Sequence, residues 1–232
     1  MISSEQIVEG VFIKERKNRF ICEVMVEDEA IECYVPSSCR LDNFIELQGK
    51  RVLLLPTETP GARTRYSLFA VPYKRNHILL SIGRVNGIIE RDIGKRCFSA
   101  LGKRSEVYRE HKIGSYKSDL FIENSKTLLE IKSVLSLEKT ALFPTVFSQR
   151  TLEQLKEISS LMDRDYKAAL VIASLSPYVE QIQIERVSPF YEALKPCLEK
   201  GMQLLAISLH IHQGEARVKK KIEIKLKGQI AK

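Results

Sequence analysis

Two acidic residues and a lysine lie close together in the chain, at a spacing that could support chemistry on a phosphate. Asp119 begins one short apolar segment, and a second segment over residues 128–134 carries Glu130 and Lys132. Both segments are typical of β-strands. Side chains alternate along a strand, so Glu130 and Lys132 face one side and their apolar neighbours the other. If the strands pair as a hairpin, Asp119 can lie beside Glu130.

Such a trio suits metal-assisted reactions. Two carboxylates can hold one or two Mg²⁺ or Mn²⁺ ions, which keep water ligands and accept phosphate oxygens. The lysine can orient the attacking water or offset charge that develops on phosphorus. We therefore predict catalytic roles for Asp119, Glu130 and Lys132, with both carboxylates as metal ligands. Alternation alone is more often produced by a solvated Glu/Lys pair on a half-exposed strand, which is the alternative.

Two resemblances strengthen the catalytic interpretation. An Asp, ten intervening residues and Glu-x-Lys resemble the PD-(D/E)xK nuclease superfamily. The wider sequence is similar to the sugar fermentation stimulation protein family, and the motifs that carry this likeness span nearly the whole chain: Gly10, 18–20, 36–41, 63–66, 129–134, 141–144 and the helical segment from 148. The second resemblance implies a DNA-binding protein with an OB-like barrel followed by a nuclease-like domain.

The chain also departs from that family at two places near the hairpin. Thr145 follows Phe143-Pro144 where the family commonly has an aspartate, so one anion near the predicted metal is missing. Lys117 replaces an arginine, which keeps the charge but loses the planar fork. These departures leave room for a nuclease-like fold that binds nucleic acid without cutting it.

A polar, kinked stretch at 72–77 divides the chain into two domains, for an α+β or α/β fold overall. We predict a small OB-like β-barrel over residues 1–75, because five short strands precede any long helix. Residues 76–232 are predicted to form a mixed-sheet α/β domain, which the resemblance implies is of the restriction-endonuclease-like type. The expected elements of this second domain are strands at 78–82, 106–110, 167–175 and 204–211, helices at 86–98, 148–162 and from 188, and one final edge strand at 217–227.

A third acidic candidate lies on the first of these helices. In nuclease-like folds a carboxylate on the first helix often assists metal binding, so Glu90 is predicted as a further metal ligand. The alternative is a surface glutamate paired with the nearby Arg91 or Lys95.

The net charge of +8 favours a polyanionic partner, with nucleic acid first. DNA is the expected partner and RNA a possible one; a solvated basic surface is the alternative. Aromatic residues interleave with basic ones in the first third of the chain, which suits base stacking and phosphate contact. A helix start also suits a phosphate. The predicted nucleic-acid contacts are Arg19, Arg63, Arg65, Lys117, Gln149 and Arg150.

The sequence also argues against several classes of protein. No apolar run approaches the ~18 residues needed to span a membrane, and the first residues lack the features of a signal peptide, so we expect a cytoplasmic protein. The five cysteines are irregularly spaced, which argues against a zinc site and a disulfide framework. The oligomeric state does not follow from the sequence.

These observations support a DNA-binding protein that is also a Mg²⁺- or Mn²⁺-dependent nuclease, hydrolysing phosphodiester bonds of DNA or RNA. The first alternative is a catalytically silent DNA-binding transcriptional regulator with a nuclease-like fold, which Thr145 favours. The second alternative is a barrel-based adaptor that binds RNA.

Overall fold

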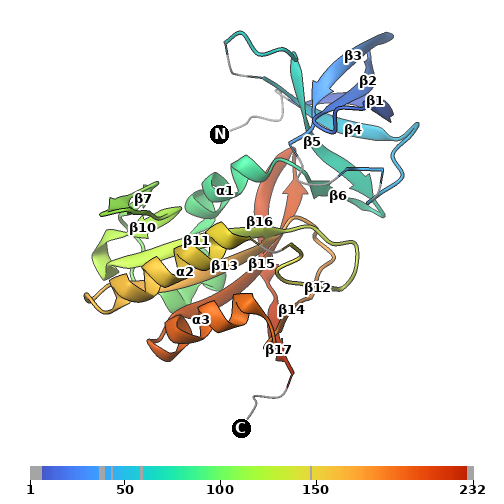
Figure 1. The fold of residues 1–232 in the computed structure, drawn as a ribbon. Helices are drawn as coiled ribbons and strands as arrows, with labels where there is room; N and C mark the ends of the chain where they lie inside the picture. The colour runs from blue at the N-terminus through green and yellow to red at the C-terminus, as the bar shows by residue number, and fades with distance from the viewer. Residues whose placement is uncertain (1–6, 37–39, 43, 58–59, 147, 229–232) are drawn as a thin grey trace. The chain divides into compact units, whose positions relative to one another are not determined.

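The chain forms two compact units, one of residues 1–85 with 210–217 and one of residues 86–209 with 218–232. The computed structural model describes most of the sequence, namely residues 7–36, 40–42, 44–57, 60–146 and 148–228. Figure 1 labels the α-helices and most of the strands of both units. The motif at 36–41 lies partly outside the described residues, at 37–39.

The first unit contains a closed barrel of five strands with a sixth strand appended. The parallel pairing of the third and fifth strands closes the barrel, and the hydrogen-bonded order is β3-β2-β1-β4-β5-β6. Gly10 lies on β1 close to β2, and a Cβ there would overlap the Val24 side chain. The predicted OB-like barrel is therefore confirmed. Its strands are β1 (Val8–Glu15), β2 (Ile21–Val26), β3 (Glu29–Tyr34), β4 (Arg51–Pro56), β5 (Tyr66–Tyr73) and β6 (Asn76–Leu79).

The strand that the sequence assigned to the start of the second domain lies in the barrel sheet. β6 pairs antiparallel with β5, with Val71 opposite Ile78. The predicted boundary between residues 75 and 76 falls in the turn that joins these two strands. The division between the compact units comes later, after Val85, because hydrogen bonding keeps β6 with β5.

The second unit is built on a mixed six-stranded sheet in the order β16-β15-β13-β11-β10-β7. The three central strands run parallel, and β10 joins β11 antiparallel. β13 is buried along almost its whole length, as expected for a strand covered on both faces. This confirms the predicted mixed α/β domain. The strands are β7 (Val107–Arg109), β10 (Leu120–Ile122), β11 (Thr127–Val134), β13 (Lys167–Ser174), β15 (Gln203–His212) and β16 (Glu215–Lys221).

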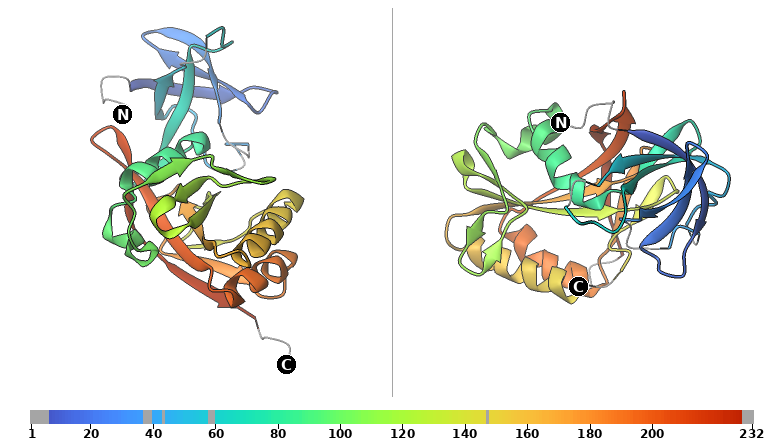
Figure 2. Two further views of the ribbon diagram at one scale, coloured as in Figure 1. Left: turned by 90° about the vertical axis from the view of Figure 1, so that its left-hand side faces the viewer. Right: turned by 90° about the horizontal axis from the view of Figure 1, so that it is seen from above.

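Helices α2 (Gln149–Met162) and α3 (Pro189–Glu199) lie side by side on one face of this sheet (Figure 2). Both begin at a serine N-cap, Ser148 and Ser188, whose hydroxyl accepts a backbone N–H bond. Their apolar sides share one core with alternate residues of the central strands. Since successive residues of β11 face opposite sides, only every second residue of that strand faces α2.

The first helix is shorter than predicted. α1 ends at Asp92, and after a break the chain forms a separate 3-10 helix, η3 (Arg96–Leu101). Gly94 lies in the break, where its unfavourable helix propensity is tolerated. Further 3-10 turns occur at η2 (Ile82–Arg84) and η4 (Glu123–Ser125), and α1 begins at Val85. No helix in the described ranges is long and apolar enough to cross a membrane.

The prediction of a single edge strand over 217–227 is wrong. The chain divides at Ile222, whose backbone N–H donates to Ala206 O at 2.9 Å and whose side chain is buried. The segment before it is β16, while the segment after it, β17 (Glu223–Lys227), belongs to another sheet. That parallel sheet also contains β12 (Thr140–Leu142) and β14 (Gln181–Glu185), and a two-stranded ribbon forms from β8 (Lys112–Ile113) and β9 (Tyr116–Lys117).

Candidate active site

The hairpin inferred from the sequence is present. β10 and β11 pair antiparallel with Leu120 opposite Leu129, and the same register continued by one residue places Asp119 across from Glu130. The connection is the 3-10 turn η4 followed by Lys126, which has a left-handed φ of 49°. The predicted pairing of the two strands is therefore confirmed.

Glu130 is buried, with 2% of its surface exposed. The Tyr116 hydroxyl donates to Glu130 Oε2 at 2.7 Å. Lys132 Nζ lies 2.7 Å from Oε1, but outside the angles of a hydrogen bond, so the contact is ionic and Oε1 has no hydrogen-bond donor among the described residues. Burial and the negative charge of Asp119 raise the pKa of the Glu130 carboxyl, against the opposing effects of Lys132 and Tyr116.

The Asp119 carboxylate is held by two different elements. Asn86 on α1 donates from Nδ2 to Oδ1 at 3.0 Å, and the backbone N–H of Ile131 on β11 donates to Oδ2 at 2.7 Å. The backbone of Asp119 also takes part, since its carbonyl accepts from Glu110 N at 3.1 Å. Each carboxylate oxygen thus has one donor and retains a further lone pair.

Lys132 lies on the same face of β11 as Glu130, toward α2. Its Nζ donates to Gln154 Oε1 on that helix at 2.8 Å and also contacts Glu130. The side chain is 23% exposed, so the ammonium group is partly open to solvent. This arrangement holds the ammonium beside the Glu130 carboxylate.

The donor set suits a hard divalent cation. In the described residues, no group of three or more His, Cys, Asp and Glu side chains is placed to hold a metal. Mg²⁺ does not require such a group, because it is commonly held by one or two carboxylates and several waters. The buried Glu130 Oε1, which lacks a hydrogen-bond donor, offers a lone pair to a cation, and an oxygen-only site favours Mg²⁺ or Mn²⁺ over zinc. The residues present therefore fit the predicted ion.

Glu90, the third predicted ligand, is engaged elsewhere. Its carboxylate pairs with the guanidinium of Arg109 on β7, through Nε and Nη2. The alternative interpretation expected a partner at Arg91 or Lys95, but those two side chains approach Asp92 instead. Glu90 remains on the helix that also carries Asn86.

The predicted nucleic-acid contacts of the second unit are exposed residues near the hairpin and α2. Lys117 Nζ forms an ion pair with Glu110 Oε2 at 2.8 Å. Gln149 Nε2 donates to Glu153 Oε1 at 3.1 Å within the first turn of α2, and Arg150 beside it is exposed.

The predicted contacts of the barrel combine arginines with aromatic rings. The Arg19 guanidinium lies 4.7 Å from the centre of the exposed Phe20 ring, and Arg65 lies 5.7 Å from that of Tyr66. Phe20 in turn stacks on Tyr34, with ring centres 6.4 Å apart. Arg63 is 78% exposed and lies 3.7 Å from Glu32.

Sequence reasoning missed three residues that complete the candidate site. Asn86 and Gln154 are polar residues of helices, and Tyr116 is an almost fully buried residue of β9. Each comes from a different element, and no local pattern links it to the hairpin. The cis peptide bond Phe143–Pro144 precedes Thr145, which is exposed.

Comparison with known proteins identifies both units. The family described as "Sugar fermentation stimulation protein RE domain" matches residues 83–215, and "SfsA N-terminal OB domain" matches residues 15–80. The sugar fermentation stimulation protein homolog of Ruminiclostridium cellulolyticum is 25% identical, over 96% of this chain and 99% of its own. The homolog of Caldanaerobacter subterraneus subsp. tengcongensis is 26% identical, over 97% and 100%.

A solved structure has the same fold. It is that of Pyrococcus furiosus SfsA in complex with Ca²⁺, which matches with a TM-score of 0.77 and 22% identity over 97% of this chain and 98% of the other. The family match over 83–215 alone spans more than half of the 232 residues. The chain therefore belongs to the sugar fermentation stimulation protein family.

Proposed function

We propose that this protein binds nucleic acid, DNA in the first place and RNA as a second substrate, and hydrolyses its phosphodiester bonds with a divalent metal ion. One observation carries the proposal: Asp119 lies opposite Glu130, with Lys132 beside it, and a buried oxygen of Glu130 lacks a hydrogen-bond donor among the described residues. Burial and the charge of Asp119 raise the pKa of this carboxyl even though the Lys132 ammonium lies 2.7 Å from Oε1, and a bound divalent cation would favour its charged form.

Asp119 and Glu130 would hold Mg²⁺ or Mn²⁺, which when bound polarises a phosphate oxygen and stabilises charge in the transition state. Lys132, held by Gln154, is the donor that would orient the attacking water. The raised pKa of the Glu130 carboxyl means that its proton must leave before the group can act as a ligand. A relative of known structure, Pyrococcus furiosus SfsA, was solved with Ca²⁺, which also prefers oxygen ligands.

The barrel supports the nucleic-acid half of the proposal. OB-folds bind oligonucleotides on the face of strands 2–3 and on the loops that join strands 1–2 and 4–5. In this barrel those loops carry Arg19 and Arg63, and the exposed rings of Phe20 and Tyr34 lie beside them on the β2–β3 side. Together with the net charge of +8, these residues suit phosphate contact and base stacking.

A catalytically silent, DNA-binding regulator is the second candidate. Two observations favour it: Thr145 leaves one carboxylate fewer than the family commonly has, and the Asp119 and Lys132 side chains already have partners inside the protein. Such internal pairing lets the hairpin be stable without a metal.

The decisive experiment compares metal binding and cleavage in one preparation. Mn²⁺ should bind the wild-type protein and bind Glu130→Gln at least tenfold more weakly, as measured by calorimetry. Glu123→Gln is the matched control, because it removes an exposed carboxylate from the same hairpin. Labelled DNA and RNA should be cut with Mg²⁺ or Mn²⁺ and stay intact with EDTA. Metal binding without cleavage of either substrate would favour the silent regulator.

Nucleic-acid binding is tested separately by its salt dependence. The logarithm of affinity for duplex DNA should fall with the logarithm of salt concentration, with a slope of about −0.9 per phosphate contact. Arg63→Ala with Arg65→Ala should weaken binding to all sequences alike, whereas the two lysine substitutions, which retain charge, should weaken it less. An affinity independent of salt would reject the barrel as a phosphate-binding surface.

A further inference from the structure

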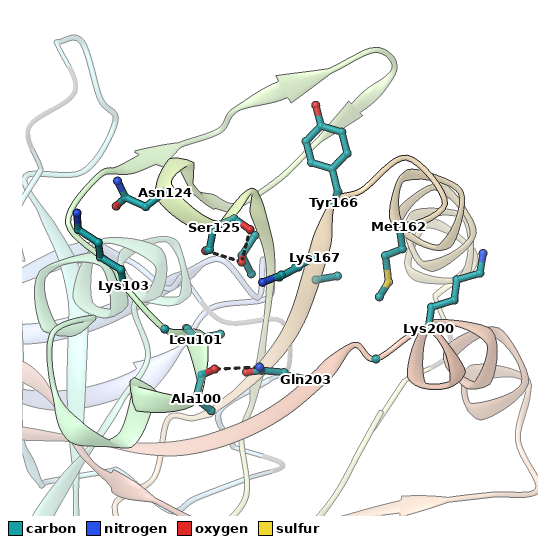
Figure 3. A pocket seen from close by; sticks show the side chains of 14 residues that line it. Ala100, Leu101, Lys103, Asn124, Ser125, Met162, Tyr166, Lys167, Lys200 and Gln203 are labelled. Atoms are coloured by element: carbon teal, nitrogen blue, oxygen red, sulfur yellow. Dashed lines mark hydrogen bonds between the residues drawn. The ribbon is translucent and has the colours of Figure 1, made fainter.

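The second unit contains a pocket that the proposed centre does not use. A cavity of about 360 Å³ lies at the amino-terminal ends of the three parallel strands β11, β13 and β15. Figure 3 shows its lining side chains, which come from the loop after η3, from η4 and from the ends of α2 and α3 as well as the strands. Thr127 in the wall lies three residues before Glu130, which places it about 10 Å away along the extended strand.

The lining of this pocket is positively charged. It contains Lys103, Lys167 and Lys200, and none of the described residues that line it has a carboxylate. Lys200 donates to Asp163, but the ammonium groups of Lys103 and Lys167 have no ion-pair or hydrogen-bond partner within the described part of the chain. Glu123 and Asp165 are close in sequence yet do not line the cavity. An anion would therefore meet two exposed ammonium groups that no carboxylate of the described residues pairs with.

Gln203 is part of the pocket wall. Its Nε2 donates to Ala100 O at 2.9 Å, as Figure 3 shows, and its Oε1 is buried. Because Oε1 is closed to solvent, a ligand in the cavity meets the fixed amide of Gln203 as wall and not as a hydrogen-bond acceptor.

The remaining wall suits a flat or apolar body. Leu101, Met162 and Ala168 line the cavity, and the half-buried Tyr166 ring stands at its edge. Methionine adapts to irregular shapes and makes favourable contacts with aromatic rings. The volume falls within the usual range of small-molecule sites, about 300–1,000 Å³.

We propose that this pocket binds a nucleoside monophosphate group, either as a free nucleotide or as the phosphorylated end of a nucleic-acid strand. Lys103 and Lys167 bind the phosphate, and the base packs against Met162 and Tyr166. The inference is independent of cleavage, because it uses none of the residues of the metal centre.

Calorimetry on the full chain in EDTA tests the pocket without the metal centre. Deoxyadenosine monophosphate should bind at least tenfold more tightly than either inorganic phosphate or deoxyadenosine. The double variant Lys103→Ala and Lys167→Ala should lose at least tenfold in affinity. Lys220→Ala with Lys227→Ala is the matched control for net charge, because both lysines are exposed on β16 and β17. This control should bind like wild type.

Two further measurements distinguish a strand end from a free nucleotide and control for misfolding of the variant. Tetranucleotides with a 5′-phosphate, a 3′-phosphate or neither reveal whether a strand end enters, and a preference that the double variant abolishes would identify the strand end. Binding of the mononucleotide alone would identify a free nucleotide. The variant Lys103→Gln with Lys167→Gln replaces the alanine pair if circular dichroism shows unfolding. Equal nucleotide affinity in the lysine variant and the control, or equal affinity for nucleotide and inorganic phosphate, would overturn the proposal.

Discussion

Asp92 and Glu130 are both buried carboxylates of the second unit, with 4% and 2% of their surfaces exposed, yet their surroundings differ. Asp92, the last residue of α1, accepts from Lys95 Nζ at 2.9 Å and from the backbone N–H of Val218 at 2.8 Å. Burial alone would raise the pKa of Asp92, but these hydrogen bonds and the charges of Lys95 and Arg91 outweigh it, so the pKa is lowered. Asp92 fastens α1 to β16.

Glu130 has fewer favourable contacts. Within the described ranges, only the Tyr116 hydroxyl donates a hydrogen bond to the Glu130 carboxylate. The Lys132 ammonium forms an ion pair with this carboxylate and also donates a hydrogen bond to Gln154. Asp119 opposite adds a like charge. Burial and that charge raise the pKa of Glu130, whereas the pKa of Asp92 is lowered.

The comparison shows that burial alone does not mark a functional carboxylate. A structural carboxylate is stabilised in its charged form by hydrogen-bond donors and nearby positive charges, and its pKa falls. A buried carboxylate that has one hydrogen-bond donor and a like charge opposite carries a cost in the free protein, and its pKa rises. If this distinction holds, substitutions of Asp92 and Glu130 should differ in their effects on cleavage, stability and pH dependence.

The largest expected difference is in cleavage. Glu130→Gln should lower the single-turnover rate at least 100-fold, the usual scale for loss of a group that acts in the chemical step. Affinity for DNA should stay within about 1–2 kcal/mol of wild type, the size of one altered contact. Asp92→Asn, measured per folded molecule, should cut at the wild-type rate. Cleavage that survives Glu130→Gln would place the centre elsewhere.

The second difference is in stability, where the substitution of Asp92 should be the harmful one. Asp92→Asn should lower the free energy of unfolding by about 2 kcal/mol, because it weakens charge-assisted hydrogen bonds to a buried group. Glu130→Gln should raise it by about 1 kcal/mol, a common gain when a functional site is relieved of a costly group. Urea denaturation measures both. Destabilisation by both substitutions alike would show that Glu130 is structural.

The pH dependence of stability should separate the residues further. The pKa of Asp92 is lowered on folding, so its contribution is present above its ordinary pKa of 3.8 and is lost as the pH falls through the folded value. The pKa of Glu130 is raised, so its contribution is present below 4.5 and is lost as the pH rises through the folded value.

The corresponding measurement is urea denaturation of three proteins across the acidic range. The stability gap between wild type and Asp92→Asn should narrow as the pH falls. The advantage of Glu130→Gln over wild type should instead grow as the pH rises above 4.5, the ordinary pKa of the Glu carboxyl. Parallel profiles for the two variants would remove the distinction between the carboxylates.

The smallest effect is expected at the residue that positions Lys132. Gln154→Met removes the acceptor 2.8 Å from Nζ and should reduce the cleavage rate about tenfold, less than Lys132→Ala. The loss should appear in kcat rather than KM, because Gln154 acts through the lysine. Gln154→Glu retains an acceptor and should recover most of the rate. A Gln154→Met enzyme with the wild-type kcat would show that Lys132 needs no support from α2.

Much of the fold and the centre of the candidate site follow from local patterns. Alternation along 128–134 places Glu130 and Lys132 on one face, and the apolar segment after Asp119 supplies the partner strand. The register then follows, because a hairpin with a short connection has few ways to pair. The barrel strands follow from the same alternation, and the serine caps before α2 and α3 mark where those helices begin.

Other features could not be predicted because they depend on packing between distant elements. Glu90 pairs with Arg109, nineteen positions away, rather than with a neighbour on its helix. The tail divides at Ile222 because that side chain is buried in the core, although the alternation on either side resembles one continuous strand. The sequence of β6 predicts the start of a new domain, but its hydrogen bonds with β5 place it in the barrel sheet.

Local sequence is enough to place residues on the hairpin and to say which face each occupies, because side-chain alternation is a local property of the backbone. The partners of these residues come from tertiary packing: Asn86 from α1, Tyr116 from β9 and Gln154 from α2. Tertiary packing also decided that Glu130 is buried with one oxygen lacking a donor in the described structure, whereas Asp92 is buried and paired. Burial and pairing depend on chain segments far apart in sequence, so the opposite pKa shifts of these two carboxylates arise only when the whole unit folds.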